Sequence, residues 1–147
     1  MYYNNNRKSC GNRPLNKRIP LAVQEVQEQY TVALQKLYEK NDLESIFFLR
    51  IAAETGLRMR DIYDLKPSEI IVRKIYKKSL KTGKYEDYPL ISEETGRIAE
   101  QLVERQGRFF SKDYLYYITE IKRQFSNPNM RLLYIVSYKR TVGKKIM

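Results

Sequence analysis

The sequence lacks histidine altogether and holds a single cysteine among its 147 residues. Without imidazole groups, the chain cannot form histidine-ligated metal sites or a Ser-His-Asp triad. Cys10 alone can form neither an internal disulfide nor a cysteine-rich zinc site. No run reaches the roughly 18–20 apolar residues of a membrane-spanning helix, and the first ten residues lack the apolar core of a secretory signal. We therefore predict a cytoplasmic protein with no metal, no cofactor and no membrane partner.

Positive charge is abundant, and its distribution along the chain is uneven. Lys and Arg number 28 against 17 Asp and Glu, which gives a net charge of +11. The excess lies in residues 1–20 (+5), 71–90 (+4) and 121–147 (+7), and the segments between these blocks are mildly acidic. Such clustering is typical of a protein that binds a polyanion, because each neutralised phosphate releases condensed counterions. A generically basic surface is the alternative interpretation.

The pattern of apolar residues predicts a mainly α-helical chain with one small antiparallel sheet, an α+β fold. Residues 1–20 are basic and rich in Asn and are expected to form a flexible arm, and residues 21–147 a single domain. Asn41 and Asp42 are expected to cap the helix that follows them, Ser111 another helix and Ser137 a terminal one. Apolar residues three or four apart predict helices over residues 21–40, 43–55, 59–65, 92–107 and 111–125.

Between these helices the periodicity changes to that of β-strands. Residues 69–76 and 85–91 are rich in β-branched and aromatic side chains, and Gly83 marks a turn between them. The predicted structure is a β-hairpin whose tip carries several lysines, among them Lys81 and Lys84.

Two acids and three tyrosines have structural explanations that compete with functional ones. Asp61 and Asp64 lie three residues apart and could share a metal ion, but no third ligand is in view, so a solvated helix face is the favoured interpretation. Tyr114, Tyr116 and Tyr117 fit an amphipathic core edge, with ring packed and hydroxyl wet, better than a base-stacking surface.

Two short motifs carry a sharper chemical signal. In TGLR (residues 55–58), Gly56 supplies the positive φ that ends a buried helix, so Arg58 is held rigidly. A guanidinium in such a place suits a phosphate, which it can bind through two parallel hydrogen bonds. In KTGK (residues 81–84), a lysine on a tight turn is a mobile charge that can enter a groove or donate a proton.

These two motifs, followed by YPL (residues 88–90), resemble the catalytic domain of tyrosine recombinases, the phage integrase family. The resemblance covers residues 21–147. It implies that Arg58 binds the scissile phosphate and that Asp61 buttresses the fold. It also implies that the hairpin lysine is the general acid toward the leaving hydroxyl, with Lys81 the better match and Lys84 the alternative.

The second motif of the family, His-x-x-Arg, corresponds to a stretch within residues 136–143. The preferred register, which matches three further positions, puts Val136 at the histidine and Lys139 at the arginine. A shift by one residue puts Ser137 at the histidine and Arg140 at the arginine. In both registers the imidazole is missing.

The chain ends at Met147, before the places at which the family's third motif and its nucleophilic tyrosine follow. Tyr134 and Tyr138 precede the expected position, and we interpret them as packing or cap-side residues. The resemblance thus predicts an abbreviated recombinase fold, incomplete at the C-terminus. We expect it to bind double-stranded DNA without cleaving it and to act in recombination, or its regulation, on a mobile element.

The expected DNA-binding surface combines the arm, the hairpin tip and the C-terminal segment. Its candidate residues are Arg7, Lys8, Arg13, Lys17, Arg18, Arg58, Lys78, Lys81, Lys84, Lys139, Arg140, Lys144 and Lys145. Two alternatives stay open. The chain could be an active or split recombinase completed by a partner chain, or a protein-binding regulator of a recombinase oligomer, in which case a full-length recombinase or further copies of the chain are its partners.

Overall fold

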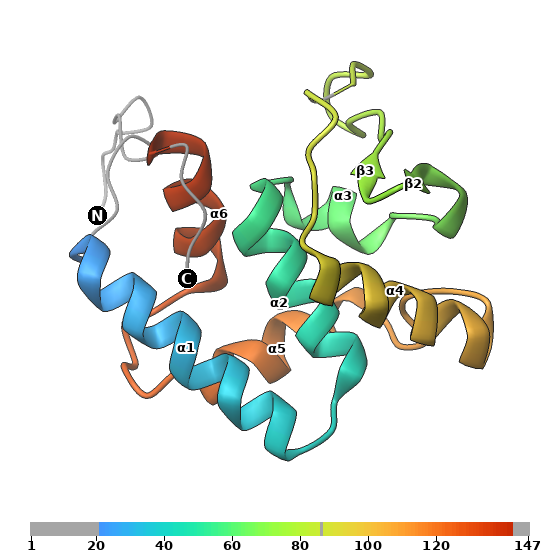
Figure 1. The fold of residues 1–147 in the computed structure, drawn as a ribbon. Coiled ribbons are helices and arrows are strands. Elements are labelled where there is room, and N and C mark those ends of the chain that lie inside the picture. The colour runs from blue at the N-terminus through green and yellow to red at the C-terminus, as the bar shows by residue number, and fades with distance from the viewer. Residues whose placement is uncertain (1–20, 86, 143–147) are drawn as a thin grey trace.

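The computed structural model describes residues 21–85 and 87–142, and the ribbon of Figure 1 shows their arrangement. Helices predominate and one two-stranded antiparallel sheet is present, so the predicted α+β class is confirmed. The predicted arm lies outside the described residues, as do Arg7, Lys8, Arg13, Lys17, Arg18, Lys144 and Lys145. The elements are α1 (Val23–Glu39), α2 (Leu43–Thr55), α3 (Met59–Tyr63), the 3-10 turn η2 (Pro67–Glu69), β2 (Ile70–Ile71), β3 (Lys74–Ile75), α4 (Glu93–Gln106), α5 (Tyr114–Gln124) and α6 (Leu132–Val142).

Helix α2 lies at the centre of the fold and contacts the other described helices on all sides. Its sequence is apolar nearly all round, and such a helix is stable only where neighbours cover every face. Aromatic rings supply much of the cover, because the ring centroids of Phe47 and Phe109 lie 4.6 Å apart and Phe48 stacks on Tyr117 at 5.8 Å. Among the described residues, no helix is both long and apolar enough to cross a membrane.

The two ends of α2 follow from its flanking residues, as the sequence predicts. The Asp42 side chain accepts a hydrogen bond from the backbone N–H of Ser45 at 3.2 Å, which satisfies one of the unpaired donors at the helix start. At the other end Gly56 adopts φ +71°, the left-handed conformation that terminates a helix. The position of the residues after Gly56 is therefore set by the central helix.

Two predicted caps are wrong. Helix α5 begins after Asp113, whose side chain accepts a backbone hydrogen bond at 3.0 Å. Ser111 instead donates its N–H and its hydroxyl to the Glu44 carboxylate, at 2.8 and 2.7 Å. Ser137 lies inside α6, which already begins at Leu132, because the apolar residues before Ser137 form the buried face of that helix.

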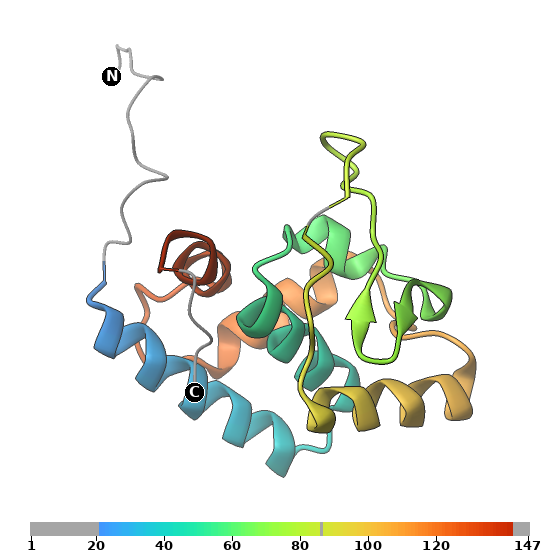
Figure 2. The ribbon, with the colours of Figure 1, turned by 45° about the horizontal axis from the view of Figure 1, so that its top comes forward.

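The predicted hairpin is right only in part: its first strand is divided into the two strands of the sheet, and among the described residues of 85–91 only single bridges form where the second strand was expected. Strand β2 pairs with β3, with Ile70 opposite Ile75, and the turn between them consists of Val72 and Arg73 at φ +49° and +64°. The chain then continues from β3 to the tip and returns beside itself, with single antiparallel bridges at Lys74–Leu90 and Lys78–Tyr85. In Figures 1 and 2 the tip, residues 79–84, projects beyond the strands.

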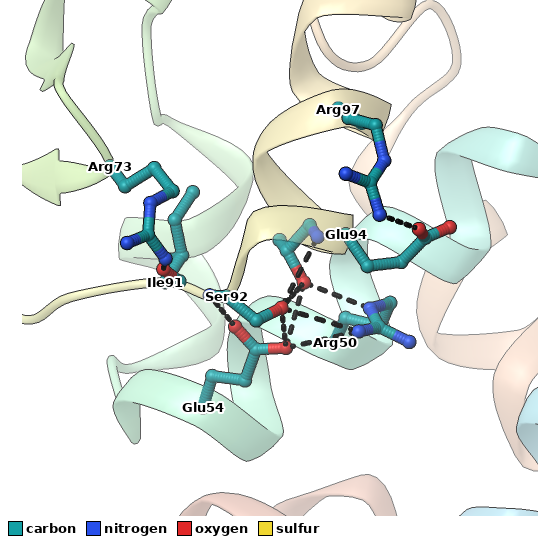
Figure 3. A network of polar contacts seen from close by, with 8 residues as sticks. Arg50, Glu54, Arg73, Ile91, Ser92, Glu94 and Arg97 are labelled. Atoms are coloured by element: carbon teal, nitrogen blue, oxygen red, sulfur yellow. Dashed lines mark hydrogen bonds and ion pairs between the residues drawn. The ribbon is translucent and has the colours of Figure 1, made fainter.

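A polar network fastens the returning segment of the hairpin to α2 (Figure 3). The buried Glu54 carboxylate accepts hydrogen bonds from the N–H of Ser92 at 2.8 Å and from the hydroxyl of Thr95 at 2.7 Å. Arg50, one turn earlier on α2, donates to the same hydroxyl at 2.8 Å and forms an ion pair with Glu54 at 3.5 Å. The start of α4 is therefore bonded to the last turn of α2, close to Gly56.

Because Val72 is β-branched and adopts a left-handed φ, the turn between β2 and β3 stores strain. We predict that Val72→Asn raises the free energy of unfolding by about 1 kcal/mol, since Asn tolerates this conformation. Urea unfolding followed by circular dichroism measures the change. Val72→Thr is the matched control, because it is polar but keeps the β-branch. A gain of equal size in both variants would contradict the strain argument.

Candidate functional site

A pocket of about 760 Å³ lies between α3, the hairpin tip, the start of α5 and α6. Four cationic side chains line it, namely Arg58, Arg60, Lys81 and Arg140, and Asp61 is the one acid among the lining residues. Met59, Leu80, Leu133 and Val136 provide apolar walls. The pocket thus collects cations from three segments that lie far apart in the sequence.

Arg58 caps the start of α3, two residues after the glycine that ends α2. Its backbone is extended, at φ −62° and ψ 144°, and its side chain is half-buried. One terminal nitrogen, Nη1, donates to the Ser79 hydroxyl at 3.2 Å. The guanidinium is therefore oriented by the central helix on one side and by the base of the hairpin tip on the other.

The hairpin tip is fastened to α3 by Asp61, whose side chain is buried. Its Oδ1 accepts the backbone N–H of Leu80 at 2.9 Å, a contact that fits the buttressing role implied by the resemblance. Its Oδ2 has no hydrogen-bond partner among the described residues. The prediction that Asp61 and Asp64 share a solvated helix face is wrong for Asp61. Within the described part of the chain, no cluster of three or more metal-ligating side chains occurs.

A second contact, between Lys77 and Asp64, fastens the hairpin to the end of α3. The Lys77 side chain is 4% exposed, and its Nζ lies 2.5 Å from Oδ2 of Asp64 and 3.8 Å from Oε2 of Glu69. The hydrogen bond from Lys77, together with the charge of its ammonium group, lowers the pKa of Asp64 below its usual value in spite of a smaller opposing effect of burial. A buried ammonium in this position requires both carboxylates nearby.

Helix α6 brings Arg140 to the pocket. Its Nε donates to the carbonyl oxygen of Gly56 at 2.6 Å, so the guanidinium lies beside the end of α2. Lys139 does not line the pocket; its stem packs on Gly56, where an added Cβ would lie 2.9 Å from its Cγ. Val136 and Ser137 both line the pocket, so the two registers differ there only in their second residue: Arg140 lines the pocket and Lys139 does not.

The structure divides the three candidate lysines of the hairpin between two places. Lys81 lines the pocket, in line with its choice over Lys84, which is exposed at the tip and outside the pocket. Lys78 is exposed on the outer face of the hairpin, where its Nζ lies 5.8 Å from the centre of the Tyr85 ring. The cations brought together are thus Arg58, Lys81 and Arg140.

Sequence reasoning did not single out Arg60 and Ser79. Arg60 lines the pocket, with its guanidinium carbon 3.9 Å from the centre of the Tyr114 ring. Ser79 accepts hydrogen bonds from Arg58 and from the N–H of Lys81, both at 3.2 Å, and so joins two candidate residues. The sequence offered no local signal for Ser79, because the residues after β3 do not alternate between apolar and polar, and the inward-facing Lys77 and Ser79 are both polar.

The tyrosines considered as nucleophiles pack elsewhere. Tyr138 is buried, and its hydroxyl accepts a hydrogen bond from Gln27 at 3.1 Å, whereas Tyr134 packs half-buried against the core. Neither residue lines the pocket. Tyr114 and Tyr116 are half-buried, as expected for a core edge. The expectation of a wet hydroxyl is wrong for Tyr117, which is fully buried and donates its hydroxyl to Glu44. Tyr114 lines the pocket, and burial raises the pKa of its hydroxyl although Arg60 partly opposes this effect.

In comparisons with known proteins, no family model, no curated protein and no solved structure matches the chain. The resemblance to tyrosine recombinases therefore rests on the TGLR and KTGK motifs and their spacing.

The contact between Asp61 and Leu80 can be tested by two substitutions. We predict that Asp61→Ala lowers the free energy of unfolding by about 1–3 kcal/mol, because the hydrogen bond between the N–H of Leu80 and the buried Asp61 carboxylate is lost. Asp61→Asn keeps an oxygen for that N–H and is expected to lose less than about 1 kcal/mol. Urea unfolding measures both values, and amide hydrogen exchange at Leu80 shows whether the tip loosens. Equal losses in both variants would show that the charge matters rather than the hydrogen bond.

The ion pair of Lys77 and Asp64 predicts that the free energy of unfolding falls as the pH becomes acidic. Because the folded pKa of Asp64 lies below the unfolded value of about 3.9, its stabilisation is complete above that value and is lost as the pH falls through the folded pKa. Asp64→Asn should therefore be less stable than the wild type at neutral pH, and the difference should narrow below about pH 4. Urea unfolding of both proteins, from neutral pH to below about pH 4, measures this difference in stability. A difference that stays constant would refute the assignment.

Proposed function

We propose that the chain binds double-stranded DNA through its phosphates, on an abbreviated tyrosine-recombinase catalytic fold, and that it acts in recombination or its regulation on a mobile element. One observation carries the proposal: Arg58, Lys81 and Arg140 come from three separate segments and line one pocket. Cations that converge from distant segments are typical of a site for a compact anion, and guanidinium groups match the geometry of a phosphate.

The electrostatics of the pocket support an anionic ligand. Arg60 adds a fourth positive charge, and the one acid of the lining is buried and bonded to the hairpin backbone. Arg58 is oriented by Ser79 and Arg140 by the carbonyl of Gly56, so little side-chain entropy is lost on binding. Phosphate contacts of this kind fix the register of a protein on duplex DNA but do not read its sequence.

We do not propose that this chain cleaves DNA strands on its own. Attack on a phosphate by a tyrosine requires a hydroxyl near the bound phosphate and a group that takes its proton. The chain has no histidine, and the hydroxyl of Tyr138 is bonded to Gln27 outside the pocket. Burial raises the pKa of Tyr114, which disfavours its phenolate form at neutral pH. These features support phosphate binding rather than phosphoryl transfer.

The affinity for a blunt duplex of about 20 base pairs tests the proposal. We expect Arg58→Ala and Arg140→Ala each to weaken binding about tenfold at low salt, and to reduce the slope of log affinity against log salt by about 0.9. Fluorescence anisotropy across a salt series measures both. Arg105→Ala, in the last turn of α4 and outside the pocket, removes the same charge and should change affinity less than about twofold.

Two results would overturn the proposal: an affinity that hardly changes with salt, or an equal loss in Arg105→Ala and Arg58→Ala. A nicked duplex tests the active-recombinase alternative in the same experiment. The proposal expects no covalent protein–DNA adduct from this chain alone. An adduct that forms with the wild type and is abolished in Arg58→Ala would favour an active recombinase instead.

A further inference from the structure

The outer face of the hairpin carries alternating lysines and tyrosines. From β3 onward the exposed residues are Lys74, Tyr76 and Lys78, whereas the residues between them, and Ser79, are buried. Successive side chains of a strand point to opposite faces, so the three exposed side chains share the outer face. This face is separate from the pocket, because none of the three lines it.

The returning segment of the hairpin extends this face with two further aromatic rings. Tyr85 is bridged to Lys78 in the register of the hairpin. The ring centroids of Tyr76 and Tyr88 lie 5.1 Å apart, and those of Tyr88 and Tyr85 lie 5.7 Å apart. The three residues are 37%, 44% and 49% exposed in the order Tyr76, Tyr88, Tyr85. They form one continuous and solvent-exposed row, named here the tyrosine row.

The backbone holds the middle ring of the tyrosine row at an energetic cost. Tyr88 adopts φ +51°, a left-handed conformation that a bulky residue rarely occupies. Strain of this kind persists where the surrounding structure enforces it, and it concentrates at binding sites. Three neighbouring aromatic rings left open to solvent also mark an interaction surface rather than a core.

The charge around the tyrosine row is positive. Residues 74–88, which span the whole row, contain five lysines and two acids, Glu86 and Asp87, so the net charge is positive. Four of the lysines, Lys74, Lys78, Lys81 and Lys84, are exposed, and Lys81 also lines the pocket. The Nζ of Lys78 lies 5.8 Å from the centre of the Tyr85 ring. Exposed aromatic rings interleaved with cations match single-stranded nucleic acid, whose bases stack on rings while its phosphates meet the charges.

We propose that the tyrosine row is a binding site for the unpaired bases of single-stranded DNA, and that the surrounding lysines bind its backbone. The site is a second one, outside the pocket that carries the proposed function, and it takes a different form of DNA. A chain with both sites binds a fork or a gap better than a blunt duplex, because phosphates of the duplex and bases of the single strand are held together.

An oligothymidine of about 12 nucleotides is the probe, and fluorescence anisotropy measures its affinity. In the triple variant Tyr76→Ala, Tyr85→Ala, Tyr88→Ala we expect the affinity to fall about tenfold or more, since base stacking is lost. The matched control replaces the same three tyrosines by Phe, which keeps the rings, and should lie within about twofold of the wild type. Affinity for the blunt duplex should change less than about twofold in both variants.

Three results would overturn the inference: an unchanged affinity in the alanine variant, an equal loss in the phenylalanine variant, or competition by polyglutamate as effective as that by oligothymidine. A measurement on the wild type needs no variant to fold. A 2-aminopurine base in the oligonucleotide should lose emission when it stacks on a ring, and unchanged emission at saturation would also overturn the inference.

The two proposals fail separately. If oligothymidine binding depends on the tyrosine row while blunt duplex binding ignores Arg58→Ala, only the proposed function is lost. If duplex binding depends on Arg58 while oligothymidine is ignored, only the tyrosine row is lost as a binding site.

Discussion

The burial of most of α2 is the constraint on which the rest of the structure depends. Most of this helix must be covered, so its polar side chains lie where partners exist. Two of them, Arg50 and Glu54, share Ser92 and Thr95 at the start of α4. The same constraint acts at the end of the helix. Gly56 turns the chain without a side chain, so the stem of Lys139 packs against it and its carbonyl accepts a hydrogen bond from Arg140. The central helix thereby fixes two sides of the pocket.

The hairpin joins this rigid centre to the surface through the two faces of one extended segment. Its inner face is buried: Ile75 packs in the core, Lys77 is bonded to Asp64 and Ser79 to Arg58, so the tip is held beside the pocket. Its outer face carries the tyrosine row and lysines. Because the period of an extended chain is two, a single run of residues supplies both surfaces, and each face can change without altering the other.

The elements that local chemistry determines could be predicted from the sequence. The apolar run of α2, its Asp42 cap and Gly56 are local signals, and all three are confirmed. Ser111 looked like a helix cap, but Glu44, 67 residues away in sequence, binds its N–H and hydroxyl, and no local rule contains that contact. The turn at Val72 and Arg73 lacks the Gly or Asn that marks such turns, so the division of the first strand could not be read from the sequence.

The choice between Lys139 and Arg140 shows why the site itself needed the fold. Neighbouring residues of a helix point about 100° apart, so a shift of one residue in an alignment moves a side chain from one face to another. Motif matching weighs identities along the chain, and there the register with Lys139 was preferred because it matches more positions. The packing of α6 distinguishes the two residues. One face of α6 is covered by α2 and Gly56, and only side chains beside that face reach the pocket. Lys139 packs its stem against that glycine, and Arg140 extends past it to the cations of the pocket. The second arginine of the site is therefore determined by the same buried helix that orients the first.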